Sequence, residues 1–314
     1  MLSGLVIVDK PQGWTSHDVV AKMRRLAGTR KVGHAGTLDP MATGVLVLGI
    51  NRATRLLTYI VGTSKTYTTT IRLGQSTITD DAEGELTTTN STSEVTEEQL
   101  FAGVAELTGE IQQVPSSVSA IKVNGERSYA RVRAGEEVKL AARPVTIERF
   151  EVHSWQRREI SGAQIIELDA TVECSSGTYI RALARDLGEK LGVGGHLTEL
   201  RRTAVGPYRI DQAQTLEEAA GQLQVLDISV AARALMPVRE LSEEETTELS
   251  FGRRIAATGQ AHSAEQPVAA FGPDGTLVAL LEDPGAAGKH AKAILVFAAA
   301  GEQQPSAAEA KEKK

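Results

Sequence analysis

An aspartate in a glycine-rich turn is the side chain of this sequence best suited to chemistry. Asp39 lies in the run Gly-His-Ala-Gly-Thr-Leu-Asp-Pro at residues 33–40, which leads into the apolar segment Met-Ala-Thr-Gly-Val-Leu. Because Pro40 favours extended backbone geometry at Asp39, we expect the carboxylate to project from a fixed loop. Such a group either caps its turn or acts alone as a nucleophile. Capping is the commoner role of an isolated Asp-Pro pair, and the residue types alone leave both roles open.

Several other chemistries lack their motifs in this sequence. The single cysteine, Cys174, excludes an internal disulfide, and the six histidines do not have the spacing of metal ligands. The glycine-rich turn is not followed by Gly-Lys-Ser/Thr, and neither Gly-x-Gly-x-x-Gly nor Gly-x-Ser-x-Gly occurs. The sequence therefore disfavours a structural zinc, a nucleotide site and a serine triad.

Strands and amphipathic helices are needed to position this loop. Apolar and β-branched runs predict strands at residues 5–8, 45–48, 66–73 and 165–172. Helical spacing and capping residues predict helices at 15–28, 51–61, 96–107 and 179–191. The acidic, Thr/Ser-rich residues 75–95 predict an exposed excursion, and Asn124-Gly125 predicts a hairpin turn.

The charge is distributed unevenly along the chain. The net charge is −6, but residues 1–75 carry ten Lys/Arg against three Asp/Glu, and residues 76–110 carry nine acids without a Lys or Arg. This asymmetry is compatible with a basic face for phosphates, or with ordinary solvated surface charge. Composition alone therefore does not identify the partner.

The length and texture of the chain predict two domains and a tail. From about residue 238, short apolar runs separated by turn signals indicate a compact β-rich module, and residues 301–314 have no apolar stripe to bury. We expect a large domain at 1–237, a small one at 238–299 and a disordered tail at 300–314. The sequence has no apolar run near the ~20 residues that cross a bilayer and no visible signal peptide, so we expect a soluble cytoplasmic protein.

Several ordered motifs carry a resemblance to a known family. They are Lys10-Pro11 with Gly13-x-Thr15-Ser16, the 33–46 run, Lys65-Thr66-Tyr67, Val114-Pro115-Ser116 with Ser119-Ala120-x-Lys122, Gly177-Thr178-Tyr179-Ile180-Arg181, and Leu200-Arg201-Arg202-Thr203. Together they resemble the bacterial tRNA pseudouridine synthase B (TruB) family over about residues 4–210. Motifs in a fixed order are far more specific than any single one.

The resemblance implies an enzyme that isomerises uridine to pseudouridine at position 55, in the T-loop of tRNA, without metal or organic cofactor. It assigns the nucleophile to Asp39 and places Arg181 beside it to keep the carboxylate ionised and oriented. Tyr67 would stack on the flipped-out base and help move the C5 proton, and His34 would fill the space that the base leaves. Tyr179 and Leu200 would line the uracil pocket and exclude water.

The implied fold is α+β, with a mixed, largely antiparallel sheet flanked by helices and a small β-rich PUA-like C-terminal domain. The implied partner is the T-arm stem-loop of tRNA, bound by a monomer, and no membrane or metal is expected. The acidic turn at residues 80–84 matches a turn of the family and is interpreted as structural. Candidate phosphate contacts are Lys22, Arg24, Arg25, Arg30, Lys31, Arg127, Arg131 and Arg133.

A second function class stays open at this point. An RNA-binding protein that folds tRNA would also need to unfold the T-loop and extrude a base, with modification as a secondary activity. Replacing Asp39 by asparagine separates the two hypotheses, because only the enzyme depends on a nucleophile.

Overall fold

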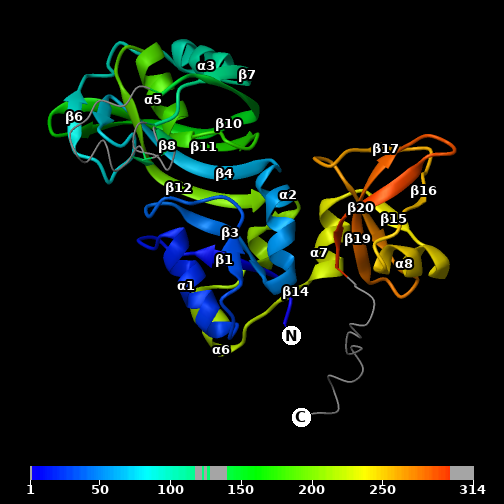
Figure 1. Ribbon diagram of the computed structural model, residues 1–314. Coiled ribbons are helices and arrows are strands. Elements are labelled where there is room, and N and C mark those ends of the chain that lie inside the picture. Colours follow the sequence, from blue (N-terminus) through cyan, green and yellow to red (C-terminus); the bar gives the residue numbers. More distant parts are fainter. Residues whose placement is uncertain (1, 117–121, 124–125, 128–139, 298–314) are drawn as a thin grey trace. The chain divides into compact units, whose positions relative to one another are not determined.

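The computed structural model describes residues 2–116, 122–123, 126–127 and 140–297 (Figure 1). The described chain forms two compact units, which are treated separately below. The larger unit comprises residues 7–48 and 60–224, and the smaller one comprises residues before 7, residues 49–59 and residues from 225 onward.

A strongly extended mixed sheet forms the centre of the larger unit. Its strands follow the order β1-β3-β12-β4-β11-β10-β7, with β2 beside β3 and β13 beside β12. Pairing is antiparallel for β12–β4, β4–β11, β11–β10 and β10–β7, and parallel for β12–β3. The bounds are β1 Gly4–Lys10, β2 Val32–His34, β3 Thr43–Ile50, β4 Lys65–Leu73, β7 Gly109–Gln113, β10 Arg143–Ile160, β11 Ala163–Cys174, β12 Gly195–Val205 and β13 Tyr208–Arg209.

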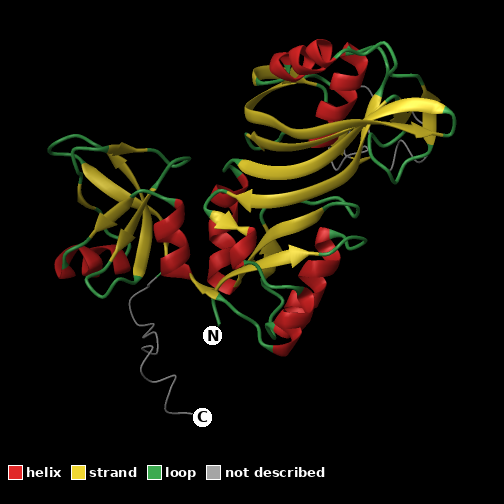
Figure 2. Ribbon diagram, turned by 180° about the vertical axis from the view of Figure 1, so that it is seen from behind, coloured by secondary structure: helices red, strands yellow, loops and turns green. Residues whose placement is uncertain are grey.

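Helices α3 (Glu97–Glu106) and α5 (Ile180–Lys190) pack together over one face of this sheet (Figures 1 and 2). Side chains alternate between the two faces of a strand, and in β4 the buried Tyr67, Thr69 and Ile71 alternate with the more exposed Thr66, Thr68 and Thr70. One face is therefore apolar and covered, and the other is polar. This arrangement confirms the predicted α+β class with a mixed, largely antiparallel sheet.

The helix starts follow local capping signals in the sequence. Thr15 caps α1 (Ser16–Leu26) and Thr96 caps α3, each by accepting a hydrogen bond from the backbone N–H of the third helical residue. The side chains of Asp18 and Gln99 accept hydrogen bonds from the backbone N–H groups of Thr15 and Thr96, which completes the two capping boxes. The predicted helices are confirmed, with α2 (Leu57–Val61) preceded by the 3₁₀ helix η1 (Asn51–Leu56), and with α6 at Leu216–Gly221 and η2 at Ile210–Gln212.

The prediction that residues 75–95 form an exposed excursion is wrong in part. This segment contains β5 (Gln75–Thr77) and β6 (Leu86–Thr89), which pair with each other. Between them Asp81 is buried, and its Oδ1 accepts a hydrogen bond from the Glu83 N–H at 3.0 Å and from the Thr79 hydroxyl at 2.5 Å. Donors within the same turn satisfy the buried carboxylate of Asp81. The acidic composition of the segment predicted exposure and therefore missed this burial.

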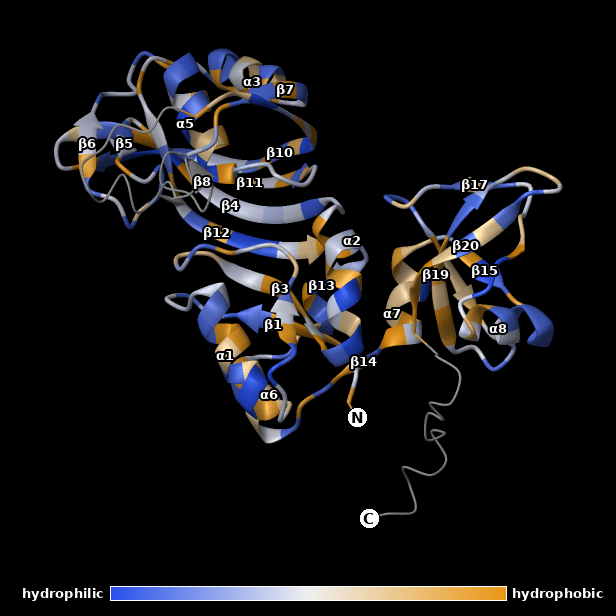
Figure 3. Cartoon of the chain, viewed as in Figure 1, coloured by the Kyte–Doolittle hydropathy of each residue, from blue (hydrophilic) through white to orange (hydrophobic). Residues whose placement is uncertain are grey.

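The smaller unit contains a second sheet with the order β15-β18-β19-β20-β16, and β17 pairs with β19. Figure 3 shows apolar residues along β19 and polar residues on α8 of this unit. The expected runs at 268–271, 277–281 and 293–297 correspond to β18, β19 and the end of β20. The bounds are β14 Leu226–Asp227, α7 Ile228–Leu235, β15 Val238–Glu240, α8 Glu243–Ser250, β16 Ile255–Ala256, β17 Ala261–His262, β18 Val268–Phe271, β19 Leu277–Pro284 and β20 His290–Val296.

Three expectations fall on residues outside the described ones. Strands β8 (Lys122–Val123) and β9 (Glu126–Arg127) pair antiparallel, but Asn124-Gly125, the predicted hairpin turn between them, lies outside the described residues. So do Arg131, Arg133 and the tail at 300–314.

Candidate active site

The loop that carries Asp39 is held by hydrogen bonds on both sides of the aspartate. The Ser16 hydroxyl accepts from the Leu38 N–H at 2.9 Å and donates to the Leu38 carbonyl at 3.1 Å. The Pro40 carbonyl accepts from the Gly13 N–H at 2.8 Å and from Lys10 Nζ at 3.3 Å. The Asp39 side chain is 39% exposed. A solvent-accessible carboxylate thus projects from a fixed backbone.

Arg181 lies between two carboxylates. Its Nη2 is 2.9 Å from Asp39 Oδ2, and its Nη1 is 3.4 Å from Asp81 Oδ2. Nη1 also donates to the Thr79 carbonyl at 2.7 Å, and the arginine side chain is only 5% exposed. The structure therefore brings together the predicted pair, Asp39 and Arg181. It also adds Asp81, which had been interpreted only as part of a turn.

Tyr67 and Leu200 belong to the same apolar cluster as Leu38 and Met41, the residues that flank Asp39. Each is 8% exposed. Burial raises the pKa of the Tyr67 phenol, while the hydrogen bond and positive charge of Arg202 act in the opposite direction. The phenol is consequently neutral at physiological pH and available as a proton donor.

Tyr179 precedes α5 and fixes the start of the helix that carries Arg181. Gln113 donates from Nε2 to the Tyr179 carbonyl at 3.0 Å, and its Oε1 accepts from the Tyr179 N–H at 2.8 Å. The Arg143 guanidinium lies 4.9 Å from the centre of the tyrosine ring. Gln113 thus holds the backbone of Tyr179, and Arg143 lies over its half-buried ring.

His34 ends β2, five residues before Asp39. Its ring meets the His17 ring edge-on at a centroid distance of 5.8 Å, and its buried Nδ1 has no hydrogen-bond partner among the described residues. Burial lowers the pKa of His34 below its usual value, and the nearby His17 adds to this. The imidazole is therefore a neutral, half-buried ring at the base of the loop.

Lys10 is a further buried cation that contacts the loop. Its Nζ donates to the carbonyls of Trp14 and Pro11 at 2.7 and 2.9 Å, in addition to Pro40. Burial lowers its pKa from the usual 10.5 to about 8, against the opposing effect of the Asp39 carboxylate. Lys10 therefore loses its charge at an unusually low pH for a lysine.

The catalytic rate constant kcat at this site is expected to fall as the pH rises through about 8. Lys10 then loses the positive charge that interacts with the Asp39 carboxylate. Lys10→Arg should keep the charge and move the fall to higher pH in a kcat–pH profile. Lys65→Arg is the matched control, since burial also lowers the pKa of Lys65 to about 8 but its Nζ binds the carbonyls of Val61 and Thr63. A fall that moves with Lys65→Arg and not with Lys10→Arg would contradict the assignment.

The titration of Lys10 does not itself destabilise the fold in this pH range. The folded-state pKa of Lys10 is below its unfolded value, so between pH 8 and 10.5 the unfolded chain binds more protons at this group than the folded chain does. The contribution of Lys10 to the free energy of unfolding therefore increases with pH in that window. Thermal unfolding measured at the same pH values separates a loss of rate from a loss of structure.

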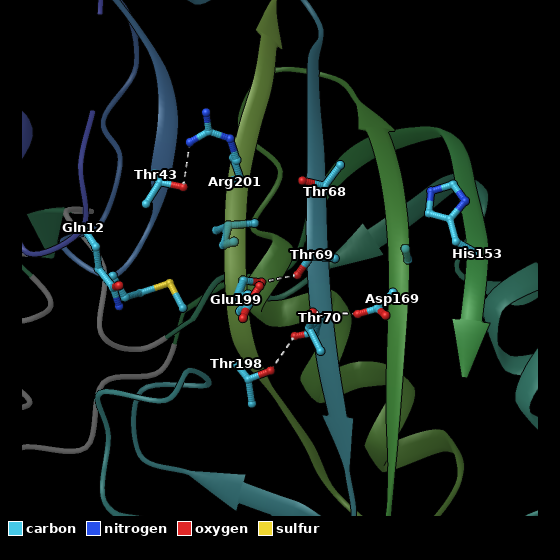
Figure 4. A pocket seen from close by; sticks show the side chains of 13 residues that line it. Gln12, Thr43, Thr68, Thr69, Thr70, His153, Asp169, Thr198, Glu199 and Arg201 are labelled. Carbon is cyan, nitrogen blue, oxygen red and sulfur yellow. Dashed lines mark hydrogen bonds between the residues drawn. The ribbon is translucent and has the colours of Figure 1, made fainter. Parts of the chain in front are cut away.

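A polar groove of about 570 Å³ lies on the other face of the sheet (Figure 4). Leu200 is the one predicted site residue in its lining. Several polar groups of the groove are already paired: the Thr70 hydroxyl donates to Asp169 Oδ1 at 2.7 Å, and Arg201 Nη1 donates to the Thr43 hydroxyl at 3.3 Å. The groove is therefore a solvated sheet face, and the Asp39–Arg181 pair remains the candidate active site.

Within the described part of the chain, no group of three or more His, Cys, Asp or Glu side chains is arranged to hold a metal ion. No helix in those same residues is long and apolar enough to span a membrane.

Comparison with known proteins identifies the family. The family model described as "TruB family pseudouridylate synthase (N terminal domain)" matches residues 24–180, half of the chain. A protein from Arthrobacter sp. (strain FB24) named tRNA pseudouridine synthase B is 74% identical over 308 residues, which cover 96% of this chain and 99% of the relative. This chain belongs to the TruB family of pseudouridine synthases.

Other matches of this TruB-family chain agree in extent. Models described as "tRNA pseudouridylate synthase B C-terminal domain" and "tRNA Pseudouridine synthase II, C terminal" match residues 181–241 and 236–298. A tRNA pseudouridine synthase B from Thermobifida fusca (strain YX) is 57% identical, with 90% of this chain and 95% of the relative covered. The predicted family is therefore confirmed over nearly the full length.

Solved structures show the same fold. A chain in "Crystal Structure of a Cbf5-Nop10-Gar1 Complex" superposes with a TM-score of 0.69 at 25% identity, with 94% of this chain and 84% of that chain covered. A chain in "Structure of H/ACA RNP bound to a substrate RNA containing 2'-deoxyuridine" gives 0.67 at 24% identity, with the same coverage. The α+β architecture of this TruB-family chain is thus that of known structures.

Proposed function

We propose that this chain converts uridine to pseudouridine at position 55, in the T-loop of tRNA, with Asp39 as the nucleophile. The observation that carries the proposal is the 2.9 Å pair between the accessible Asp39 carboxylate and the buried Arg181, in a member of the TruB family. The pair orients a carboxylate that backbone hydrogen bonds already hold in place. A carboxylate can attack carbon and then leave, as this isomerisation requires.

The reaction exchanges one bond to the ribose for another. The Asp39 carboxylate forms a bond to carbon and the N1–C1′ bond of uridine breaks. A C5–C1′ bond then forms, and the bond to Asp39 breaks, which returns the free carboxylate. The C5 proton is then removed and N1 gains a proton, so that substrate and product are isomers. Tyr67 stacks on the base and takes part in moving the C5 proton. Leu200 and Tyr179 keep water from the broken glycosidic bond.

The base must leave its stack before Asp39 can reach it, at a cost of a few kcal/mol. We propose that the His34 ring fills the space that the base vacates. The ring is neutral, it lies at the start of the nucleophile loop, and its Nδ1 has no hydrogen-bond partner among the described residues. In the smaller unit, we assign RNA binding to the β-rich module at 238–299. Its support is the match of a TruB C-terminal family model to residues 236–298.

The experiment that tests the proposal is incubation of the full chain with an unmodified tRNA transcript, followed by mapping of pseudouridine along the RNA. We expect a single product, at the T-loop uridine. A transcript in which that uridine is replaced by cytidine is the control and should gain no pseudouridine. Product only at another uridine would overturn the substrate assignment, and no product at all would overturn the activity.

His34→Ala is expected to lower kcat/KM by about 10-fold on the folded T-arm, because the flipped state loses the ring that fills the vacated stack. The same variant should lose much less on a short single-stranded RNA that contains the target uridine, since little stacking has to be broken there. Steady-state kinetics on the two RNAs measure the difference. An equal loss on both would contradict a role in base extrusion.

A further inference from the structure

Two consecutive arginines lie where the strand of the nucleophile loop meets the strand of Tyr67. Strand β12 pairs on one side with β3, with Arg201 opposite Thr43 and Arg202 opposite Gly44. On its other side it pairs with β4, with Arg202 opposite Tyr67. The loop with Asp39 leads directly into β3. Arg201 and Arg202 therefore occupy the junction between the two parts of the site.

The two side chains point to opposite faces of the sheet, because successive residues of a strand alternate. Arg201 points into the polar groove (Figure 4), where it is 40% exposed and forms two hydrogen bonds with Asp9, at 3.0 and 2.7 Å. Arg202 points to the covered face and is 1% exposed. Of these two consecutive arginines, Arg201 is therefore partly exposed to solvent and Arg202 is buried behind the nucleophile loop.

The buried guanidinium of Arg202 holds the backbone of that loop. Its Nε donates to the Val45 carbonyl at 2.8 Å, Nη2 donates to the Gly36 carbonyl at 3.1 Å, and Nη1 is 3.4 Å from the Thr37 carbonyl. These carbonyls precede and follow Asp39. A planar group with donors in a fixed fork sets three acceptors in one geometry, which an ammonium group cannot do.

Gly44 allows this close approach. Its φ of +99° lies in the left-handed region, and a Cβ at this position would lie 2.1 Å from the Arg202 carbonyl oxygen. The backbones of β3 and β12 are therefore in contact at Gly44 and Arg202, the residue whose side chain extends to the loop.

Arg202 also acts on the charges of the site. Its positive charge is one of the causes that lower the pKa of Lys10, and it opposes the rise in the pKa of Tyr67. The same guanidinium thus influences the group behind Asp39 and the group that faces the base.

We propose that Arg202 is a positioning residue, which holds the 36–45 backbone against β4 so that Asp39 and Tyr67 meet the target base in the geometry needed for bond formation. The proposal rests on the proposed function, and Arg202 acts through Asp39 and Tyr67 without touching the reacting atoms. Small displacements of a nucleophile are sufficient to matter: about 1 Å can lower a rate by ~100-fold.

The test compares Arg202→Met and Arg202→Lys with the matched control Arg201→Met, which removes the neighbouring arginine from the opposite face. We expect kcat to fall by about 100-fold in Arg202→Met and by about 10-fold in Arg202→Lys, because the lysine can reach fewer carbonyls. Arg201→Met should stay within about 3-fold of the unchanged chain. The dissociation constant for tRNA, measured by filter binding, should change by less than about 3-fold in all three.

A pH profile adds a readout that damage to the sheet would not produce. The charge of Arg202 lowers the pKa of Lys10 by less than burial does, so the alkaline fall in kcat near pH 8 should move slightly to higher pH in Arg202→Met and stay in place in Arg201→Met. If Arg202→Met does not fold, Arg202→Lys alone carries the comparison of kcat with tRNA affinity.

Two results would overturn the inference. One is a kcat near that of the unchanged chain in Arg202→Met or, failing its folding, in Arg202→Lys. The other is an equal fall of kcat in the Arg201 and Arg202 variants together with weaker tRNA binding, which indicates general damage to the sheet. Failure of the proposed function is a separate outcome, since the unchanged chain would then form no pseudouridine.

Discussion

Asp39→Asn is expected to abolish pseudouridine formation, with kcat lower by on the order of 10⁴-fold or more, as for other enzymes that lose their nucleophile. The amide has nearly the same shape as the carboxylate, and the hydrogen bonds that fix its loop join Ser16, Gly13 and Lys10 to the backbone of Leu38 and Pro40. The loop should therefore keep its position, and tRNA affinity should change by less than about 3-fold. Single-turnover assays and filter binding measure the two quantities.

Asp169→Asn is the matched control for this substitution. Asp169 lies on the groove face, where its two oxygens accept from the hydroxyls of Thr70 and Ser154. The oxygen of an asparagine can accept from one hydroxyl, and the other hydroxyl can rotate to accept from the amide N–H. Its activity should remain within about 3-fold of the unchanged chain. Substantial product from Asp39→Asn would contradict the nucleophile assignment. A role in tRNA folding that persists in cells carrying Asp39→Asn would support the RNA-chaperone hypothesis instead.

Local signals predicted the elements that local interactions determine. The starts of α1 and α3 follow from Thr15 with Asp18 and from Thr96 with Gln99, and a capping box needs no tertiary partner. Strand β10, Arg143–Ile160, was not predicted. Many of its residues are exposed, so it lacks the run of apolar side chains that identifies a strand. Its pairing with β7 and β11 stabilises it instead.

The candidate site could be predicted only as far as the family motifs extend. Asp39 and Arg181 are 142 positions apart, and it was the resemblance that connected them. Asp81 was missed, because a turn-forming aspartate and a buried partner of Arg181 have the same sequence signature. The role of Arg202 was missed too, because no strand was predicted at residues 195–205, and only alternation along a strand shows that Arg201 and Arg202 face opposite ways.

Arg181→Met is expected to lower both activity and stability. Asp39 loses the cation at 2.9 Å that orients it, and we expect kcat to fall by on the order of 10³-fold, as when a charge-stabilising donor is removed from an active site. Asp81, whose side chain is 4% exposed, loses its charged partner at 3.4 Å. Removing one member of a buried ion pair costs about 3–5 kcal/mol of the free energy of unfolding, because the other charge stays buried. Denaturant unfolding and single-turnover kinetics measure the two losses.

The double variant Arg181→Met with Asp81→Asn separates the two effects. An uncharged amide at position 81 removes the unpaired buried charge and can still accept hydrogen bonds from the Thr79 hydroxyl and the Glu83 N–H. Most of the lost stability should therefore return, while activity stays low because Asp39 still lacks its partner. Recovery of activity along with stability would mean that Arg181 stabilises the fold and does not orient the Asp39 carboxylate. Persistent instability with low activity would show that the interaction of Arg181 with the Thr79 carbonyl, rather than its charge, supports the turn beneath the site.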